Sequence, residues 1–152
     1  IRDRPNMGVL VGKSFTALAK GESAVEKDLN IARDIFTTVG DVKEISEDLI
    51  DSITAISGSG PAYFAYFLKA LKEAASEIGL SDIADSITMD TFVAAVDILR
   101  NMDLSADELI KKVASPGGTT EACINFWEQN GFSELVKEGI KKARQRGKEL
   151  GK

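Results

Sequence analysis

The 152-residue sequence contains no histidine. Histidine general bases, Ser-His-Asp and Cys-His nucleophilic centres, and histidine-containing zinc sites are therefore excluded. The single cysteine, Cys123, excludes an intramolecular disulfide framework and suits a reducing compartment. No apolar run reaches the roughly 18 residues that a membrane span requires. The first residues, Ile1-Arg2-Asp3-Arg4, lack the layout of a signal peptide. We therefore expect a soluble, cytoplasmic protein that works with hydroxyls, carboxylates, amines and backbone groups.

The composition indicates one ordinary globular domain, or a small domain with an appendage, because 43% of the residues are hydrophobic. The formal net charge is −5, so binding of nucleic acid would require a local basic patch. The only candidate is the segment 137–148, where acidic residues lie among the bases and no aromatic residue interleaves. We interpret it as the solvated face of a helix, and we expect neither nucleic acid nor a membrane as a partner.

The first 45 residues have the pattern of a β-α-β piece. The β-leaning residues between Met7 and Ala19 predict one or two short strands. Ser23-Ala24-Val25-Glu26 matches a capping box, and apolar residues at helical spacing then predict a helix over about 24–39 with a left-handed stop at Gly40. Val42–Ile45 predicts another strand. A sheet this small cannot bury itself alone.

From Ser46 onward the apolar spacing is helical throughout. We expect helices over about 46–56, 61–79 and 81–101, a short helix opened by the capping box Ser105-Ala106-Asp107-Glu108, a helix after Thr120 that ends at Asn130-Gly131, and a charged helix over about 133–149. The predicted fold is therefore mainly α, with a boundary between residues 45 and 46.

Two glycine-rich segments interrupt this helical part. The segment Ser57-Gly58-Ser59-Gly60-Pro61 places glycines before a helix, as in anion-binding loops. The dinucleotide fingerprint fails there, because its third glycine would fall at Tyr63. We therefore interpret the segment as a tight helix-to-helix turn, whose small residues allow close packing.

The second segment is Ser115-Pro116-Gly117-Gly118-Thr119-Thr120. Two successive glycines permit converging N–H groups, and the helix that follows adds the positive end of its dipole. Such a loop suits a small carboxylate. The alternative is an ordinary glycine-rich loop in which Thr119 or Thr120 caps the helix.

Four motifs in this order resemble the C-terminal half of pyrroline-5-carboxylate reductase: Asp48–Asp51, Ser57–Tyr63, Ser115–Thr120 and Gly131-Phe132. Pro5-Asn6 followed by Val11-Gly12 also resembles the end of that family's nucleotide domain. The resemblance implies that residues 1–45 are the closing β-α-β portion of a Rossmann-type dinucleotide-binding domain. Residues 46–152 would then form a helical dimerisation and substrate-binding domain, in a homodimer or a higher homo-oligomer.

The resemblance also implies an activity, the NAD(P)H-dependent reduction of 1-pyrroline-5-carboxylate to L-proline, the last step of proline biosynthesis. The family's N-terminal glycine fingerprint is missing from this sequence. We therefore expect a fragment that is inactive in isolation. Two alternatives stay open, a related reductase acting on another imine or a keto acid, and a non-catalytic oligomerisation module.

The resemblance assigns roles to individual residues. The N–H groups of Gly118, Thr119 and Thr120 would hold the substrate carboxylate, and the Thr120 hydroxyl would be the catalytic group that hydrogen-bonds the ring nitrogen. Asn6 would lie near the nicotinamide. Glu47 matches a carboxylate near the substrate, although an acid at a helix start explains it too. The full substrate-binding set is Ser115, Gly117, Gly118, Thr119, Thr120 and Glu47, and no metal is expected.

Overall fold

The computed structural model describes residues 1–151. The chain forms two compact units, the first from Ile1–Phe64 together with the residues from Lys137 onward, the second from Ala65–Val136. The divisions fall inside two helices, α3 (Gly60–Glu77) and α7 (Phe132–Leu150). The boundary predicted at residue 45 marks the end of the sheet rather than a break in contacts, and it stays a prediction.

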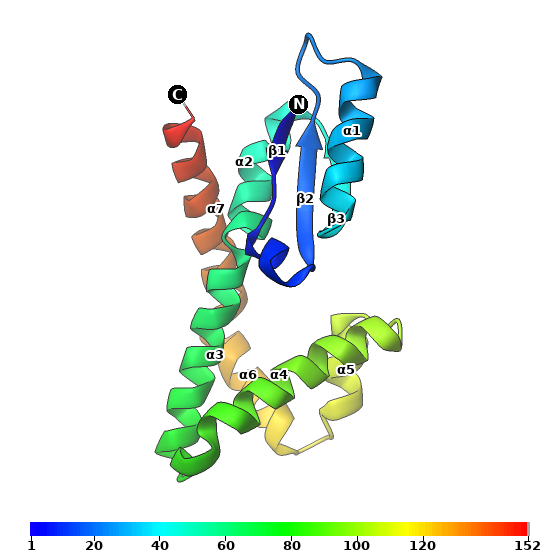
Figure 1. Cartoon of the computed structure of the whole chain (residues 1–152). Coiled ribbons are helices and arrows are strands. Elements are labelled where there is room, and N and C mark those ends of the chain that lie inside the picture. Colours follow the sequence, from blue (N-terminus) through cyan, green and yellow to red (C-terminus); the bar gives the residue numbers. More distant parts are fainter. Residues whose placement is uncertain (152) are drawn as a thin grey trace. The chain divides into compact units, whose positions relative to one another are not determined.

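The first unit contains a three-stranded sheet in the order β1-β2-β3 (Figure 1). Strand β2 (Ser14–Ala19) pairs antiparallel with β1 (Arg2–Arg4) and parallel with β3 (Gly40–Ile45), which it reaches through helix α1 (Glu26–Thr37). Because β2 is central, Ala17, Leu18 and Ala19 are fully buried. Leu29 of α1, Ile50 of α2 (Ile50–Ile53) and Ala55 complete this small core.

Gly40 lies where the chain enters β3 against the start of β2. A Cβ at this position would lie 2.0 Å from the carbonyl oxygen of Ser14, and the φ angle of Gly40 is +153°. Only glycine tolerates both conditions. The predicted left-handed helix stop at Gly40 is wrong, because α1 already ends at Thr37 and Gly40 begins the strand.

Other local predictions for the first 45 residues need correction. Residues Met7–Val11 form a 3-10 helix rather than a strand, closed by Gly12 at φ +66°. Helix α1 begins after Val25, whose N–H donates to the Asp28 carboxylate at 3.0 Å, so Ser23 is not the cap. Strand β1 was not predicted, since its three residues are all charged.

The helix predicted over 46–56 does not end in a turn but continues with changing pitch. A 3-10 turn over Glu47–Leu49 leads into α2, a π-helical turn follows over Thr54–Gly58, and α3 begins at Gly60. In the π turn the Ser59 N–H donates to the Thr54 carbonyl, five residues back, at 3.0 Å. Pro61 has no N–H to offer the carbonyl four residues earlier, which favours this irregular turn.

The second unit is helical. It holds most of α3, then α4 (Ala84–Asn101), α5 (Ala106–Val113), α6 (Thr119–Gln129) and the first residues of α7. These helices match the predicted ones to within a few residues. The capping box that opens α5 is confirmed, because the Ser105 N–H donates to the Glu108 carboxylate at 2.8 Å and the Glu108 N–H donates to Ser105 Oγ at 3.2 Å. Within residues 1–151, every helix falls short of the length and apolar character that crossing a membrane demands.

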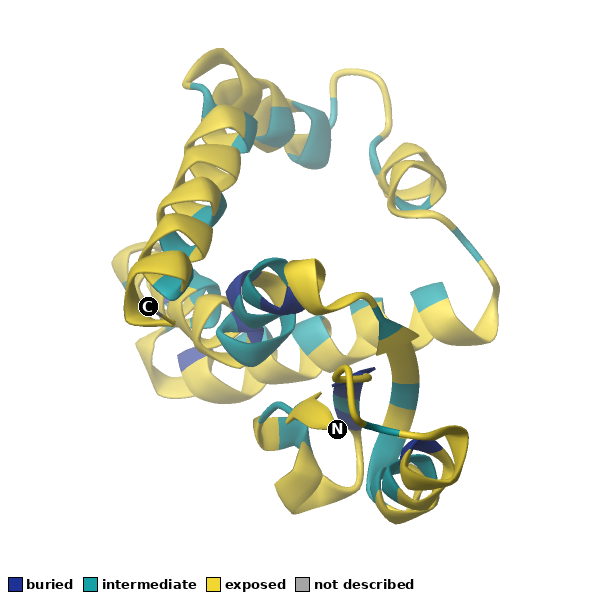
Figure 2. Cartoon of the chain, turned by 90° about the horizontal axis from the view of Figure 1, so that it is seen from above, coloured by how far each residue is buried: buried dark blue, intermediate teal, exposed yellow. Residues whose placement is uncertain are grey.

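The second unit buries little of its apolar surface. Its only buried hydrophobic residues are Ala75 and Ala84, and Figure 2 shows its helices almost wholly intermediate or exposed. One aromatic cluster is present, in which the Trp127 ring lies 6.1 Å from that of Phe67 and 5.7 Å from that of Phe132. Exposed large apolar side chains include Tyr66, Ile78, Ile87, Met89, Val93, Val96, Met102 and Phe126. A chain that folds this way leaves a wide apolar surface uncovered.

Candidate functional site

The loop Ser115–Gly118 connects α5 to α6 and sets the direction of the α6 N-terminus. Gly118 is the N-cap residue in extended conformation, and Thr119 and Thr120 are the first two residues of α6. The Gly118 N–H donates to the Ser115 carbonyl at 2.9 Å. This bond closes the loop into a tight turn.

Both glycines of this loop are required, for different reasons. Gly117 has a φ angle of +71°, which side-chain-bearing residues rarely adopt. Gly118 has an ordinary backbone conformation, but a Cβ there would lie 2.4 Å from Ser115 Oγ and 2.9 Å from the Ser115 carbonyl oxygen. The loop is therefore built around the close approach of Ser115 to Gly118.

Two N–H groups at the start of α6 are available to a ligand. Thr119 and Thr120 lie in the first turn, where a helix supplies no carbonyl acceptor. No residue in the described part of the chain accepts a hydrogen bond from them. The predicted third donor, the Gly118 N–H, is already bonded to Ser115. The folded loop thus offers two of the three expected N–H donors at the positive end of the helix dipole.

Thr120 combines this N–H with a half-buried hydroxyl. Its Oγ1 forms no hydrogen bond with any of residues 1–151, although threonine in a helix often bonds a carbonyl one turn back. The hydroxyl is therefore free to donate to or accept from a bound molecule.

The sequence analysis missed one residue of this loop, Glu121. Its carboxylate accepts the Gly117 N–H at 2.7 Å. Glu121 is the third residue of α6, the position from which a glutamate reaches back in a capping box, and this spacing was the available signal. The bond holds the negative charge of Glu121 on the Gly117 side of the loop.

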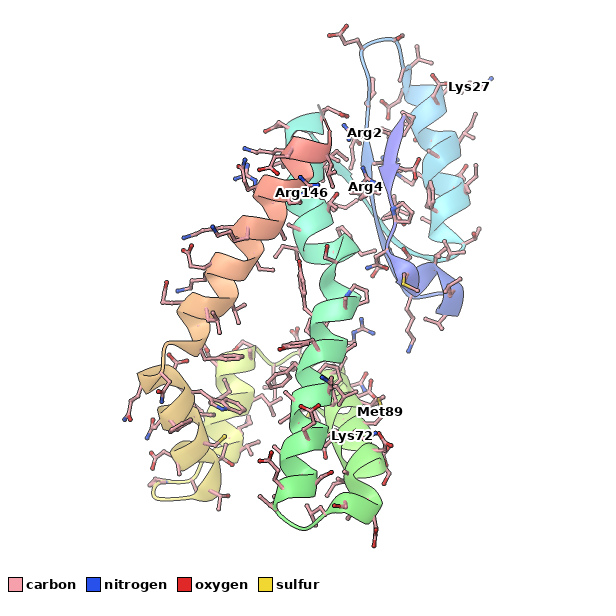
Figure 3. The ribbon with its side chains drawn as sticks, turned by 90° about the vertical axis from the view of Figure 1, so that its left-hand side faces the viewer. Arg2, Arg4, Lys27, Lys72, Met89 and Arg146 are labelled. Atoms are coloured by element: carbon pink, nitrogen blue, oxygen red, sulfur yellow. The ribbon has the colours of Figure 1, made fainter. Side chains whose placement is uncertain are left out.

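The remaining predicted site residues lie in the first unit. Glu47, in the 3-10 turn before α2, forms an ion pair with Arg2 of β1, and both side chains are about half exposed. Figure 3 shows Arg2 and Arg4 on this strand. Such an exposed pair contributes little stability.

Asn6 follows β1 and forms four hydrogen bonds, one of them from the Val9 N–H to its carbonyl oxygen at 3.2 Å. Its Oδ1 accepts the Gly8 N–H at 2.9 Å, its Nδ2 donates to Ser57 Oγ at 3.1 Å, and its backbone N–H donates to Ser14 Oγ at 3.4 Å. The structure therefore brings Asn6 together with Ser57 of the first glycine-rich segment. Within the described residues, no three or more His, Cys, Asp or Glu side chains gather in a group that could hold a metal ion.

Comparison with known proteins gives consistent matches. A family model described as pyrroline-5-carboxylate reductase dimerisation matches residues 47–150. The pyrroline-5-carboxylate reductase of Synechocystis sp. is 36% identical, over 100% of this chain and 57% of the relative. The pyrroline-5-carboxylate reductase of Thermus thermophilus is 37% identical, over 99% of this chain and 58% of the relative.

Solved structures agree with these matches. A pyrroline carboxylate reductase from Plasmodium falciparum with NADP bound superposes with a TM-score of 0.91 at 30% identity, over 99% of this chain and 61% of that one. A pyrroline-5-carboxylate reductase from Coxiella burnetii gives a TM-score of 0.90 at 37% identity, over 98% and 56%. The chain spans a little over half the length of the curated relatives that it matches.

Proposed function

This chain belongs to the pyrroline-5-carboxylate reductase family, and from that premise we propose that it is part of an enzyme that reduces 1-pyrroline-5-carboxylate to L-proline with NADPH or NADH. The observation that carries the proposal is the loop before α6, with two open N–H groups and one free hydroxyl. Residues 1–45 would close the nucleotide-binding domain, and residues 46–152 would form the dimerisation and substrate-binding domain. The end of the sheet at Ile45 and the family match from residue 47 support this division.

The residues present fit only part of a nicotinamide cofactor. The sequence has no Gly-x-Gly-x-x-Gly segment to hold the pyrophosphate. Asn6, whose Nδ2 is held by Ser57 Oγ, offers an amide hydrogen of the kind that binds the nicotinamide half. When bound, the cofactor supplies a hydride to the C=N carbon. The 152-residue chain alone is accordingly proposed to bind the cofactor weakly and to be inactive.

The loop supplies binding and electrostatics. The N–H groups of Thr119 and Thr120 hold the substrate carboxylate, whose charge stays constant through the reaction, so these groups act through positioning. The ring nitrogen gains the electron pair of the C=N bond and takes a proton from solvent. The Thr120 hydroxyl donates a hydrogen bond to that nitrogen, where the charge changes most, so its contribution is larger in the transition state than in the ground state.

Substitution of Thr120 in the full-length enzyme tests this role. Thr120→Ala should lower kcat by roughly tenfold to a thousandfold, if the lost interaction is worth about 1.4 to 4 kcal/mol. Thr120→Ser should recover much of the loss, because the hydroxyl returns. Steady-state kinetics provide the measurement. A kcat within about twofold of the parent, in an intact oligomer, would show that Thr120 acts only as a structural residue at the N-terminus of α6.

The exposed apolar surface of the second unit supports a homodimer. An open groove lined almost wholly by apolar side chains runs between α3 and α4, with Phe67, Leu71 and Ile87 among them. Obligate interfaces resemble a core cut in half, and this unit lacks a core of its own. We therefore propose that folding and association of this chain are inseparable.

Leu71→Asp tests this dimer. The charge would enter the apolar groove, and we expect loss of both helical structure and association, measured by circular dichroism and light scattering. Lys27→Asp is the matched control, because Lys27 lies on the exposed side of α1 (Figure 3). A folded parent that stays monomeric at micromolar concentration would refute the proposed dimer.

A further inference from the structure

The orientation of the Asn6 side-chain amide is determined by its two partners. The backbone N–H of Gly8 can only donate, so the atom that faces it at 2.9 Å must be the oxygen, Oδ1. The nitrogen, Nδ2, then faces Ser57 Oγ at 3.1 Å, and the serine hydroxyl accepts from it. The Ser57 hydroxyl is thus the group that holds the nitrogen end of the amide.

The backbone of Asn6 is anchored separately. Its N–H donates to Ser14 Oγ at 3.4 Å, and Ser14 Oγ lies 3.2 Å from Thr16 Oγ1. Ser14 and Thr16 belong to the central strand and are almost completely buried. Because this anchor does not touch the side-chain amide nitrogen, replacing Ser57 would release the nitrogen while the backbone stays in place.

Ser57 reaches Asn6 from the π turn over Thr54–Gly58. One extra residue in a helical turn rotates the side chains that follow by about 100°, because an α-helix has about 3.6 residues per turn. Single π turns are frequent at functional sites. The irregular turn therefore has a local consequence, the placement of one hydroxyl against Asn6.

This hydrogen bond leaves two donors side by side. Nδ2 of Asn6 keeps its second hydrogen and Ser57 keeps its hydroxyl hydrogen, and neither meets an acceptor within residues 1–151. Both residues are only partly buried, so a ligand can reach them. The second Nδ2 hydrogen of Asn6 can therefore donate to an acceptor oxygen of a ligand. We propose that Ser57 is a positioning residue that holds the Asn6 amide for an acceptor oxygen on the nicotinamide half of the cofactor, an inference that rests on the proposed function.

A double-mutant cycle in the full-length enzyme tests Ser57. The dissociation constant of NADPH is measured by fluorescence titration for the parent, Ser57→Ala, Asn6→Ala and the double variant. Ser57→Ala should weaken NADPH binding about fivefold, the value that corresponds to one neutral hydrogen bond. In the Asn6→Ala background the same change should weaken binding less than twofold, because the partner is gone. Ser57→Thr should restore binding.

Two controls separate this role from a structural one. Ser52→Ala removes a hydroxyl from the same helical stretch without touching Asn6, and it should leave binding unchanged. The ligand 2′,5′-ADP lacks the nicotinamide, so its dissociation constant should change less than twofold in Ser57→Ala. The kcat for the imine should also fall in Ser57→Ala, since a misplaced nicotinamide loses its alignment.

The outcomes decide between the proposals. An unchanged NADPH constant in Ser57→Ala overturns the inference, as does equal weakening in both backgrounds or equal weakening of 2′,5′-ADP. A parent enzyme that binds NADPH but leaves pyrroline-5-carboxylate unreduced refutes the proposed substrate alone, and the binding cycle still tests Ser57. A parent that binds neither NADPH nor NADH refutes both.

Discussion

Replacing Gly118 with alanine should weaken substrate binding by the full-length enzyme. The backbone conformation of Gly118 accepts alanine, so the effect comes from crowding alone. The new Cβ would lie 2.4 Å from Ser115 Oγ, which can rotate away, and 2.9 Å from the Ser115 carbonyl oxygen, which cannot. That carbonyl accepts the Gly118 N–H and closes the loop. It must retreat by about half an ångström to reach an ordinary contact of 3.4 Å.

The magnitude follows from the cost of overpacking. Inserting a methyl group into a tight site costs about 1 to 3 kcal/mol. If this cost is borne by the bound state, KM for the imine rises roughly fivefold to 150-fold. The kcat should change less, because the proposed role of the displaced donors is to hold a carboxylate whose charge stays constant.

Steady-state kinetics and a thermal melt measure the two effects separately. Adding Ser115→Ala to Gly118→Ala should leave the KM raised, because the alanine at position 115 still presents the carbonyl oxygen that the new Cβ meets. Gly139→Ala is the control, since a Cβ on that residue of α7 meets no other atom within 4 Å. A KM within twofold of the parent in a folded Gly118→Ala enzyme would refute the reasoning.

Two predictions concern stability. Gly40→Ala should lower the free energy of unfolding by about 3 kcal/mol or more, because a positive φ and a backbone clash with Ser14 add together. A melting temperature within about 2 °C of the parent would contradict this, because a shift that small corresponds to less than about 1 kcal/mol. The pKa of Glu108 is lowered from its ordinary 4.5, first by the Ser105 backbone N–H and then by the Ser105 hydroxyl. The ionised Glu108 carboxylate therefore contributes its full stability when the pH is above its ordinary pKa of 4.5, and this contribution is lost as the pH falls through the lowered pKa. Glu108→Gln should lack this step in denaturant titrations between pH 7 and pH 3, whereas a parent-to-variant difference that is constant with pH would refute the assignment.

The parts of the fold that could be predicted from the sequence depend on local interactions. The capping box at Ser105 needs only a side chain three residues away, and it is present. The cap of α1 failed because Val25 uses its backbone N–H, which every residue type except proline has. Strand β1 carries three charged residues and exists through pairing with β2, a contact between distant segments that no local pattern records.

In the candidate site, too, the features set by local interactions could be predicted and those set by distant contacts could not. The loop glycines and the start of α6 at Thr119 follow from local rules of turns and helix ends. The bond between Asn6 and Ser57 joins residues 51 apart in sequence, and it depends on a π turn that the sequence signalled only through Pro61. We interpreted that proline as the start of a new helix, and α3 does begin at Gly60, but the π turn that precedes it was not predicted.

The sparse burial of the second unit also bears on how this protein tolerates mutation. In most proteins, exposed positions accept nearly any residue and buried ones do not. If assembly completes the core, Ile78, Ile87 and Val93 will behave in a mutational scan as interior residues, although a single chain exposes them. Polar substitutions there would enlarge the pool of unassembled chains, whose uncovered apolar helices are substrates for chaperones and proteases. Such variants would then lose function because the unassembled chains are degraded, and not because a catalytic step is impaired.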